Sequence, residues 1–245
     1  MTMPGSCFGW VLVLAGAVAA GAAGAADSWL QPYAGASSAP AAPWAVVGLP
    51  KQSKPYTRFS VVDVDGRRAL RVEADKSYGN LVHPLKRSIT AAHLAWQWRV
   101  DEPLTRADLR EKQGEDIAVK VCTVWDLPMD QVPFAERQAL RVARAATDGE
   151  LPTATVCYVW DPALPVGTKL DSPFTRRLRY IVLRNGQDPL KQWTEDRRDI
   201  AADFLALFGD ESTTLPPLVG ILVGADSDNT RAHSVAHVAD IVLGP

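Results

Sequence analysis

Residues 94–100 read Leu-Ala-Trp-Gln-Trp-Arg-Val, and this stretch decides the fold class. Its first, third, fifth and seventh residues are large and apolar, which is the period of a β-strand that buries one face. Two tryptophans on the buried face predict a thick core between two sheets. Similar alternation recurs at residues 117–125 and 178–182, and apolar runs at 218–223 and 234–243 predict two late strands.

A hairpin is expected before the 94–100 strand. Residues 59–64 and 67–74 are rich in β-type residues, and the dipeptide Asp65-Gly66 separates them. Asp-Gly tolerates the positive φ that a two-residue hairpin turn requires. These segments therefore predict the first long strands of the domain.

Two segments interrupt the β pattern and predict helices. Residues 134–146 are rich in Ala and Arg, which favour helix. The second helix is expected to begin with Thr194 as its N-cap and to end at Gly209. Many short strands, two isolated helices and no βαβ alternation predict a mainly β protein. The expected fold is a jelly-roll-like β-sandwich of the galactose-binding or carbohydrate-binding-module type, with two peripheral helices.

The amino-terminal end resembles an export signal. Residues 9–26 contain no charged residue and finish in small residues, so residues 1–26 are interpreted as a cleaved signal peptide, with an uncleaved anchor as the alternative. Residues 27–55 then form an extended lead-in rich in Ala, Pro and Ser, and 56–245 a single domain. The mature protein is expected in the periplasm or outside the cell, with no transmembrane span after signal cleavage.

The charge balance excludes some partners. The chain has 26 Lys and Arg against 28 Asp and Glu, a formal net charge of −2. A balance this close to zero gives no electrostatic footprint for nucleic acid or for an anionic membrane surface. We therefore expect no nucleic-acid partner.

Two cysteines follow the predicted signal peptide, and each occupies a strand-like stretch. Cys122 and Cys157 would face each other if those two strands paired, and an oxidising compartment would then permit a disulfide. Because a disulfide requires a geometry that sequence does not display, the simpler interpretation is two buried free thiols.

An acidic turn supplies the main candidate site. Asp226, Asp228 and Asn229 directly follow the apolar run 218–223, so their oxygens would lie at a strand end. Calcium prefers such hard oxygen ligands, and Asp240 is expected to complete the metal set, with Asp116 as a further candidate. The alternative is an Asx-turn in which these side chains accept backbone N–H groups.

Other candidates surround this turn. Trp160 and Trp125 are each followed by Asp, a pattern suited to stacking a sugar beside a carboxylate, and core packing is the alternative. Arg197 is a candidate for binding a ligand carboxylate. A hydrolase would instead pair Glu115 or Asp116 with an acid of the turn.

Several separated blocks resemble, in order, those of the domain of unknown function 3047 family. The resemblance spans residues 56–243 and implies an exported bacterial protein with a β-sandwich fold. It supplies no catalytic residues. The blocks are residues 94–100, 114–121, 157–160, 193–200 with Asp203 and Phe208-Gly209, and 226–230.

Three functions follow as hypotheses. The first is a binding module for a carbohydrate or another polar envelope ligand, with calcium as a candidate cofactor and no established catalytic residue. The second is a hydrolase acting on envelope polysaccharide through paired carboxylates. The third is a structural or assembly protein of the cell envelope that contacts partners through an exposed sheet edge.

Overall fold

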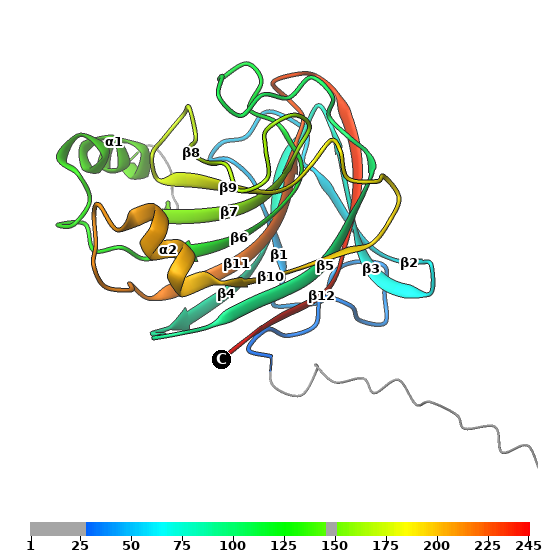
Figure 1. The fold of residues 1–245 in the computed structure, drawn as a ribbon, viewed down its shortest axis with the longest axis horizontal. Helices are drawn as coiled ribbons and strands as arrows, with labels where there is room; N and C mark the ends of the chain where they lie inside the picture. The colour runs from blue at the N-terminus through cyan, green and yellow to red at the C-terminus, as the bar shows by residue number, and fades with distance from the viewer. Residues whose placement is uncertain (1–27, 146–150) are drawn as a thin grey trace, which may run out of the picture.

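The protein is a sandwich of two twisted β-sheets, shown by a computed structural model that describes residues 28–145 and 151–245 (Figure 1). The predicted signal peptide lies outside the described residues. The larger sheet has seven strands in the order β1-β4-β11-β6-β7-β9-β8. Their bounds are β1 Ala45–Val47, β4 Tyr78–Arg87, β11 Leu218–Asp226, β6 Ile117–Trp125, β7 Ala154–Asp161, β9 Leu178–Asn185 and β8 Lys169–Asp171.

The smaller sheet has five strands in the order β10-β5-β12-β3-β2. The chain passes between the sheets at β1–β2, β3–β4, β4–β5, β5–β6, β9–β10, β10–β11 and β11–β12, so neighbours in a sheet are mostly distant in sequence. This alternation confirms the expected jelly-roll-like sandwich. The strand bounds are β10 Thr194–Asp199, β5 His93–Glu102, β12 His233–Gly244, β3 Arg67–Asp75 and β2 Arg58–Val64.

The core lies between the sheets and is rich in aromatic side chains. Trp96 and Trp98 on β5 are both buried, as their alternation predicts, and their rings meet edge to face with centroids 5.4 Å apart. Tyr158 and Trp160 approach them from β7 in the opposite sheet, at 5.2 and 5.9 Å. Edge-to-face and offset aromatic pairs stabilise a core beyond the burial of their area.

The hairpin of β2 and β3 forms as expected. Val64 pairs with Arg67, and the two residues between them, Asp65 and Gly66, have φ of 52° and 77°. Positive φ at both central residues is the requirement of a tight hairpin turn, which glycine meets at little cost.

The first helix is confirmed and the start of the second is corrected. Helix α1 spans Phe134–Ala145, and α2 spans Ile200–Phe208. Thr194 is not its N-cap, because residues 194–199 pair with β5 as an edge strand. Asp199 caps α2 instead, since its carboxylate accepts the N–H groups of Ala201 and Ala202. Strand pairing overrides the local helix signal here.

Part of the expected lead-in belongs to the sandwich. Leu30, Tyr33 and Trp44 are buried in the core, and β1 pairs with the edge of β4. The Trp44 indole donates to the backbone carbonyl of Gln31 at 2.7 Å. The packed domain therefore takes in residues before 56.

The two cysteines form a disulfide, which corrects the interpretation as free thiols. Cys122 on β6 is the direct cross-strand partner of Cys157 on β7, with Cα atoms 4.1 Å apart. Both lie on the face of the seven-stranded sheet that points away from the main core, in a second apolar cluster with Val159, Tyr180 and Val182.

Candidate functional site

Two connections between the sheets meet at one end of the sandwich. The turn that follows Asp226, the last residue of β11, leads into β12, and residues 76–77 lead from β3 into β4. The two segments are joined directly, because Lys76 N–H donates to the Ala232 carbonyl at 3.0 Å. This end of the molecule contains the acidic turn predicted from the sequence.

Buried hydroxyl groups hold the two connections together. Ser77 and Ser227 are at most 1% exposed and bond each other twice, from Ser227 N–H to the Ser77 carbonyl at 2.9 Å and from Ser77 N–H to the Ser227 hydroxyl at 3.3 Å. The Thr57 hydroxyl lies 3.1 Å from that of Ser77 and donates to the Ala225 carbonyl at 2.9 Å. The backbone of this sheet end is thereby fixed.

Asp116 holds the acidic turn from below. Its carboxylate accepts the N–H of Asn229 at 3.1 Å, and the N–H and hydroxyl of Thr230 at 2.6 and 2.5 Å. The Asn229 amide returns a bond to the Glu115 carbonyl at 2.8 Å. Asp116 is 1% exposed, so its carboxylate binds backbone and hydroxyl donors of the protein and does not face solvent.

Asp226 and Lys120 form a buried ion pair next to the turn. The Lys120 ammonium lies 3.3 Å from the Asp226 carboxylate, which also accepts the N–H of Ile117 at 3.1 Å. Burial raises the pKa of Asp226 from 3.8 to about 7, and Lys120 opposes that rise. Burial alone would lower the pKa of Lys120, but Asp226 and other nearby acidic groups outweigh it and raise that pKa.

Glu115 is also enclosed. Glu115 lies in the loop that precedes β6, it is 6% exposed, and its carboxylate accepts the hydroxyls of Tyr180 and Ser172. Burial and the neighbouring Glu115 raise the pKa of Tyr180 well above its usual value, which keeps the phenol protonated as a donor. Glu115, Asp116 and Asp226 are thus brought together, but all three face protein groups.

Above this buried layer lies an open pocket of about 490 Å³. Such a volume is within the range of small-molecule sites. Asp228 contributes one wall and forms an ion pair with Lys54. The pocket is lined by Lys54, Pro55, Asp75, Lys76, Asp228 and Arg231.

Two cationic residues of the pocket have left-handed backbone. Lys76 has a φ of 50° and Arg231 a φ of 53°, and each lies in one of the two connections. This conformation is unfavourable for a residue with a Cβ atom and is usually left to glycine. It turns the chain sharply at the mouth of the pocket.

The structure separates the remaining predicted site residues. Trp160 is 3% exposed and faces the core, so the sugar-stacking role expected for it is corrected. Arg197 is exposed on β10 and lies on a strand rather than around a helix. Asp240 lies on β12 and pairs with Arg67 at 2.9 Å.

The expected calcium ligands therefore do not assemble. Asp226 binds Lys120, Asp228 binds Lys54, and Asp240 binds Arg67. Among the described residues, no group of three or more His, Cys, Asp or Glu side chains is placed to hold a metal ion. Asn229 donates its side-chain amide to the Glu115 carbonyl in the loop before β6, so it joins the turn to that loop.

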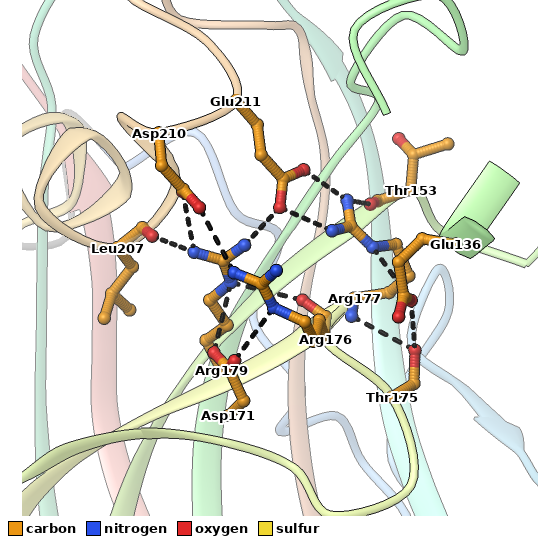
Figure 2. Close-up of polar contacts among 10 residues, drawn as sticks. All are labelled: Glu136, Thr153, Asp171, Thr175, Arg176, Arg177, Arg179, Leu207, Asp210 and Glu211. Atoms are coloured by element: carbon orange, nitrogen blue, oxygen red, sulfur yellow. Dashed lines mark hydrogen bonds and ion pairs between the residues drawn. The ribbon is translucent and has the colours of Figure 1, made fainter. Parts of the chain in front are cut away.

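A second charged cluster lies at the opposite end of the seven-stranded sheet, where β9 begins (Figure 2). Arg177 donates twice to Glu211 at 2.6 Å, and Arg179 donates to Glu211 and to Asp210. Arg176 links Asp171 and Asp210 at 3.1 and 3.2 Å. Each arginine has an acidic partner, so the cluster fastens the segment after α2 to the sheet.

Sequence reasoning missed most of the pocket. Lys54 comes from the predicted lead-in, and Lys76 and Asp75 lie in a connection that carries no known motif. Arg231 was within reach, because it directly follows the acidic turn. The three buried hydroxyl residues gave no signal, since Ser and Thr are common in surface loops.

The chain belongs to the family described as "Protein of unknown function (DUF3047)", which matches residues 42–242. This confirms the resemblance drawn from the separated sequence blocks. No curated protein matches the chain by sequence. Within the described residues, no helix combines the length and apolarity needed to cross a bilayer.

Solved structures of similar fold include carbohydrate-active proteins. TmCBM61, in complex with β-1,4-galactotriose, is 10% identical with a TM-score of 0.35, over 82% of this chain and 88% of that one. The xyloglucanase domain of NopAA from Sinorhizobium fredii, in complex with cellobiose, is 9% identical with a TM-score of 0.42, over 82% and 97%. Endoglucanase 3 of Trichoderma harzianum, from family GH12, is 10% identical with a TM-score of 0.40, over 83% and 97%. Values this low leave the function of this chain open.

Proposed function

We propose that the protein is a binding module for a hydroxyl-rich polar ligand of the carbohydrate class. The ligand lies in the pocket between the β3–β4 and β11–β12 connections. One observation carries the proposal: about 490 Å³ of open space is walled by charged donors and acceptors that lie mainly on two connections joined by hydrogen bonds.

The pocket chemistry suits a polyol. Asp75 and Asp228 accept hydroxyl protons, Lys54 and Lys76 donate to ring or hydroxyl oxygens, and Pro55 offers an apolar wall. Because the connections are tied to each other and to Asp116, little of the backbone has to be ordered when the ligand binds. Pre-organisation of this kind lowers the entropic cost of association.

Binding is favoured over polysaccharide hydrolysis. A glycoside hydrolase needs two carboxyl groups that flank the scissile bond. Of the four acids expected to supply them, Glu115, Asp116 and Asp226 are buried against protein donors, and only Asp228 reaches the pocket. The pocket's other carboxylate is Asp75, and each of the two has a lysine ammonium beside it, Lys76 for Asp75 and Lys54 for Asp228.

We also propose that the protein works outside the cytoplasm, in the periplasm or as a secreted protein. Two observations support this location. Residues 9–26 have the composition of an export signal, and the Cys122–Cys157 disulfide is a bond that persists in oxidising compartments. Fractionation of the native host's cells, with blotting for the processed chain, tests it, and a purely cytoplasmic protein would refute it.

Calorimetric titration with a panel of neutral and acidic oligosaccharides tests the binding proposal. The double variant Lys54→Gln/Asp228→Asn removes the charges of one pocket wall together, and we expect its affinity to fall at least tenfold, since each lost charged hydrogen bond weakens binding by that order. The matched control is Arg68→Gln/Asp63→Asn, an exposed ion pair on the β2–β3 hairpin. The proposal fails if no saccharide binds, or if the two double variants bind alike.

A further inference from the structure

We infer that the ligand of this pocket is an acidic saccharide, one that carries a carboxylate among its hydroxyl groups. The inference rests on the proposed function and specifies its ligand. It is drawn from the charges that line the pocket, from which of them are already paired, and from the backbone that presents them.

The pocket has an excess of positive charge. Its lining contains three cations, Lys54, Lys76 and Arg231, against the two carboxylates of Asp75 and Asp228. The chain as a whole carries a formal net charge of −2, so this end differs in sign from the protein's balance. Complementary potentials of this kind select the charge of a partner.

The excess resides in Arg231. Lys54 is in contact with Asp228, and the Lys76 ammonium lies 3.9 Å from the Asp75 carboxylate. Arg231 is exposed and forms no ion pair with any residue in the described part of the chain. A planar guanidinium offers a fork of donors that matches a carboxylate in two parallel hydrogen bonds.

A second arginine contacts the acidic turn from outside the pocket lining. Arg106 donates to the backbone carbonyl of Thr230 at 3.0 Å, directly before Arg231 in the chain. It is exposed, and no described carboxylate is within ion-pair distance of it. Arg106, from the loop between β5 and β6, therefore adds a second positive charge to this end of the sandwich.

The backbone at Arg231 supports a use for its side chain. At a φ of 53°, an arginine costs about 1 kcal/mol or more compared with glycine. Lys76, across the pocket mouth, has the same unfavourable conformation. Of the six described non-glycine residues with positive φ, Lys76 and Arg231 are the two that line the pocket.

The predicted ligand combines these features. The ligand's carboxylate pairs with the Arg231 guanidinium, which is the single unpaired charge of the lining. The neighbouring hydroxyl groups of the sugar ring donate to Asp75 and Asp228. A hexuronate residue in an oligosaccharide has this chemistry. A neutral sugar of the same size would leave the Arg231 guanidinium without an anionic partner.

The test compares trigalacturonate with galactotriose, two sugars of equal length, by calorimetry on the full mature chain. We expect the acidic sugar to bind at least tenfold more tightly, with an advantage that shrinks as salt is raised from 50 to 500 mM, because charge attraction is screened. Arg231→Gln should remove most of this advantage, because it should lower the affinity for trigalacturonate at least tenfold more than the affinity for galactotriose. Arg231→Lys, which keeps the charge but loses the fork, should retain part of it.

The outcomes separate the inference from the proposed function. Equal affinity for the two sugars overturns the acidic preference and leaves a saccharide-binding module. If Arg231→Gln lowers the affinity for both sugars equally, the acidic preference is also overturned, because Arg231 would then bind sugar hydroxyl groups and not a carboxylate. Tighter binding of inorganic phosphate than of trigalacturonate would redefine the site as a phosphate site. Binding of neither sugar rejects the proposed function itself.

Discussion

At the end of the seven-stranded sheet where β9 begins, Arg177 and Arg179 are buried against Glu211, which is only 2% exposed (Figure 2). At the opposite end, where β11 finishes, Arg231 stands in solvent beside Asp228 and Lys54. Both ends combine arginine with acids at strand termini. They differ in whether the charges have been taken out of water and paired within the protein.

This difference separates stability from binding. A desolvated ion pair is costly to break, because the remaining partner is left charged and buried. An exposed guanidinium contributes little to folding but is free to meet a ligand. Residue type alone therefore does not identify a binding site. The burial of a charged group and its pairing within the protein indicate whether it stabilises the fold or is free to bind a ligand.

Glu211→Gln should destabilise the protein most. The substitution keeps the shape of the side chain but leaves two buried guanidiniums without their shared carboxylate, so the free energy of unfolding should fall by about 3–5 kcal/mol. Urea unfolding followed by circular dichroism measures it. Asp210→Asn is the control, because Asp210 is 53% exposed and its loss should cost less than about 1 kcal/mol. Equal losses of unfolding free energy in the two variants would show that burial does not separate the two kinds of ion pair.

Asp226 should make stability depend on pH in the opposite sense to an ordinary salt-bridged acid. Its folded-state pKa of about 7 lies above the usual 3.8. Between these values the folded protein binds more protons than the unfolded chain, so this contribution is full below pH 4 and is lost as the pH rises through 7.

Comparison with the variant Asp226→Asn isolates the contribution of the Asp226 carboxyl group to the pH dependence of stability. From pH 4 to pH 8, the stability of the natural protein relative to the variant should decline by roughly 2–4 kcal/mol. Urea unfolding at each pH measures it, with Asp63→Asn as the baseline for removing an exposed carboxylate. A relative stability that rises with pH would show that Lys120 dominates the pair.

Asp116→Asn should weaken the hydrogen bonds that hold the acidic turn beside the pocket. The amide has only one acceptor oxygen and carries no charge, whereas the carboxylate accepts three donors from the turn. We expect a loss of about 2 kcal/mol in unfolding free energy and faster hydrogen exchange at the amides of Asn229 and Thr230. Unchanged exchange there would mean that Asp116 does not hold the turn.

Arg231→Gln should have the smallest effect on stability. The side chain is exposed and unpaired among the described residues, so the free energy of unfolding should change by less than about 0.5 kcal/mol. A thermal unfolding scan beside the binding measurement checks this. A loss comparable with that of Glu211→Gln would place Arg231 among the structural arginines and remove the contrast between the two ends.

Local sequence patterns are enough to predict the sandwich, the β2–β3 hairpin and helix α1. Each of these follows from a pattern of local residues, because period-two alternation, an Asp-Gly turn and an Ala-rich run act over a few positions. The family was also readable, from blocks that lie in order along the chain. The acidic turn at Asp226 was recognised as a place of interest for the same local reason.

Strand pairing, the burial of Trp160 and the contact between Cys122 and Cys157 depend on the tertiary structure. Residues 194–199 became a strand because β5 offered an edge to pair with, and Trp160 turned inward because β7 faces the tryptophans of β5. Cys122 and Cys157 met through the register of β6 and β7. The pocket joins positions 54, 75–76 and 228–231, which are far apart in the chain. Contacts at such separations depend on how strands pair across sheets, and a single sequence does not encode that pairing locally.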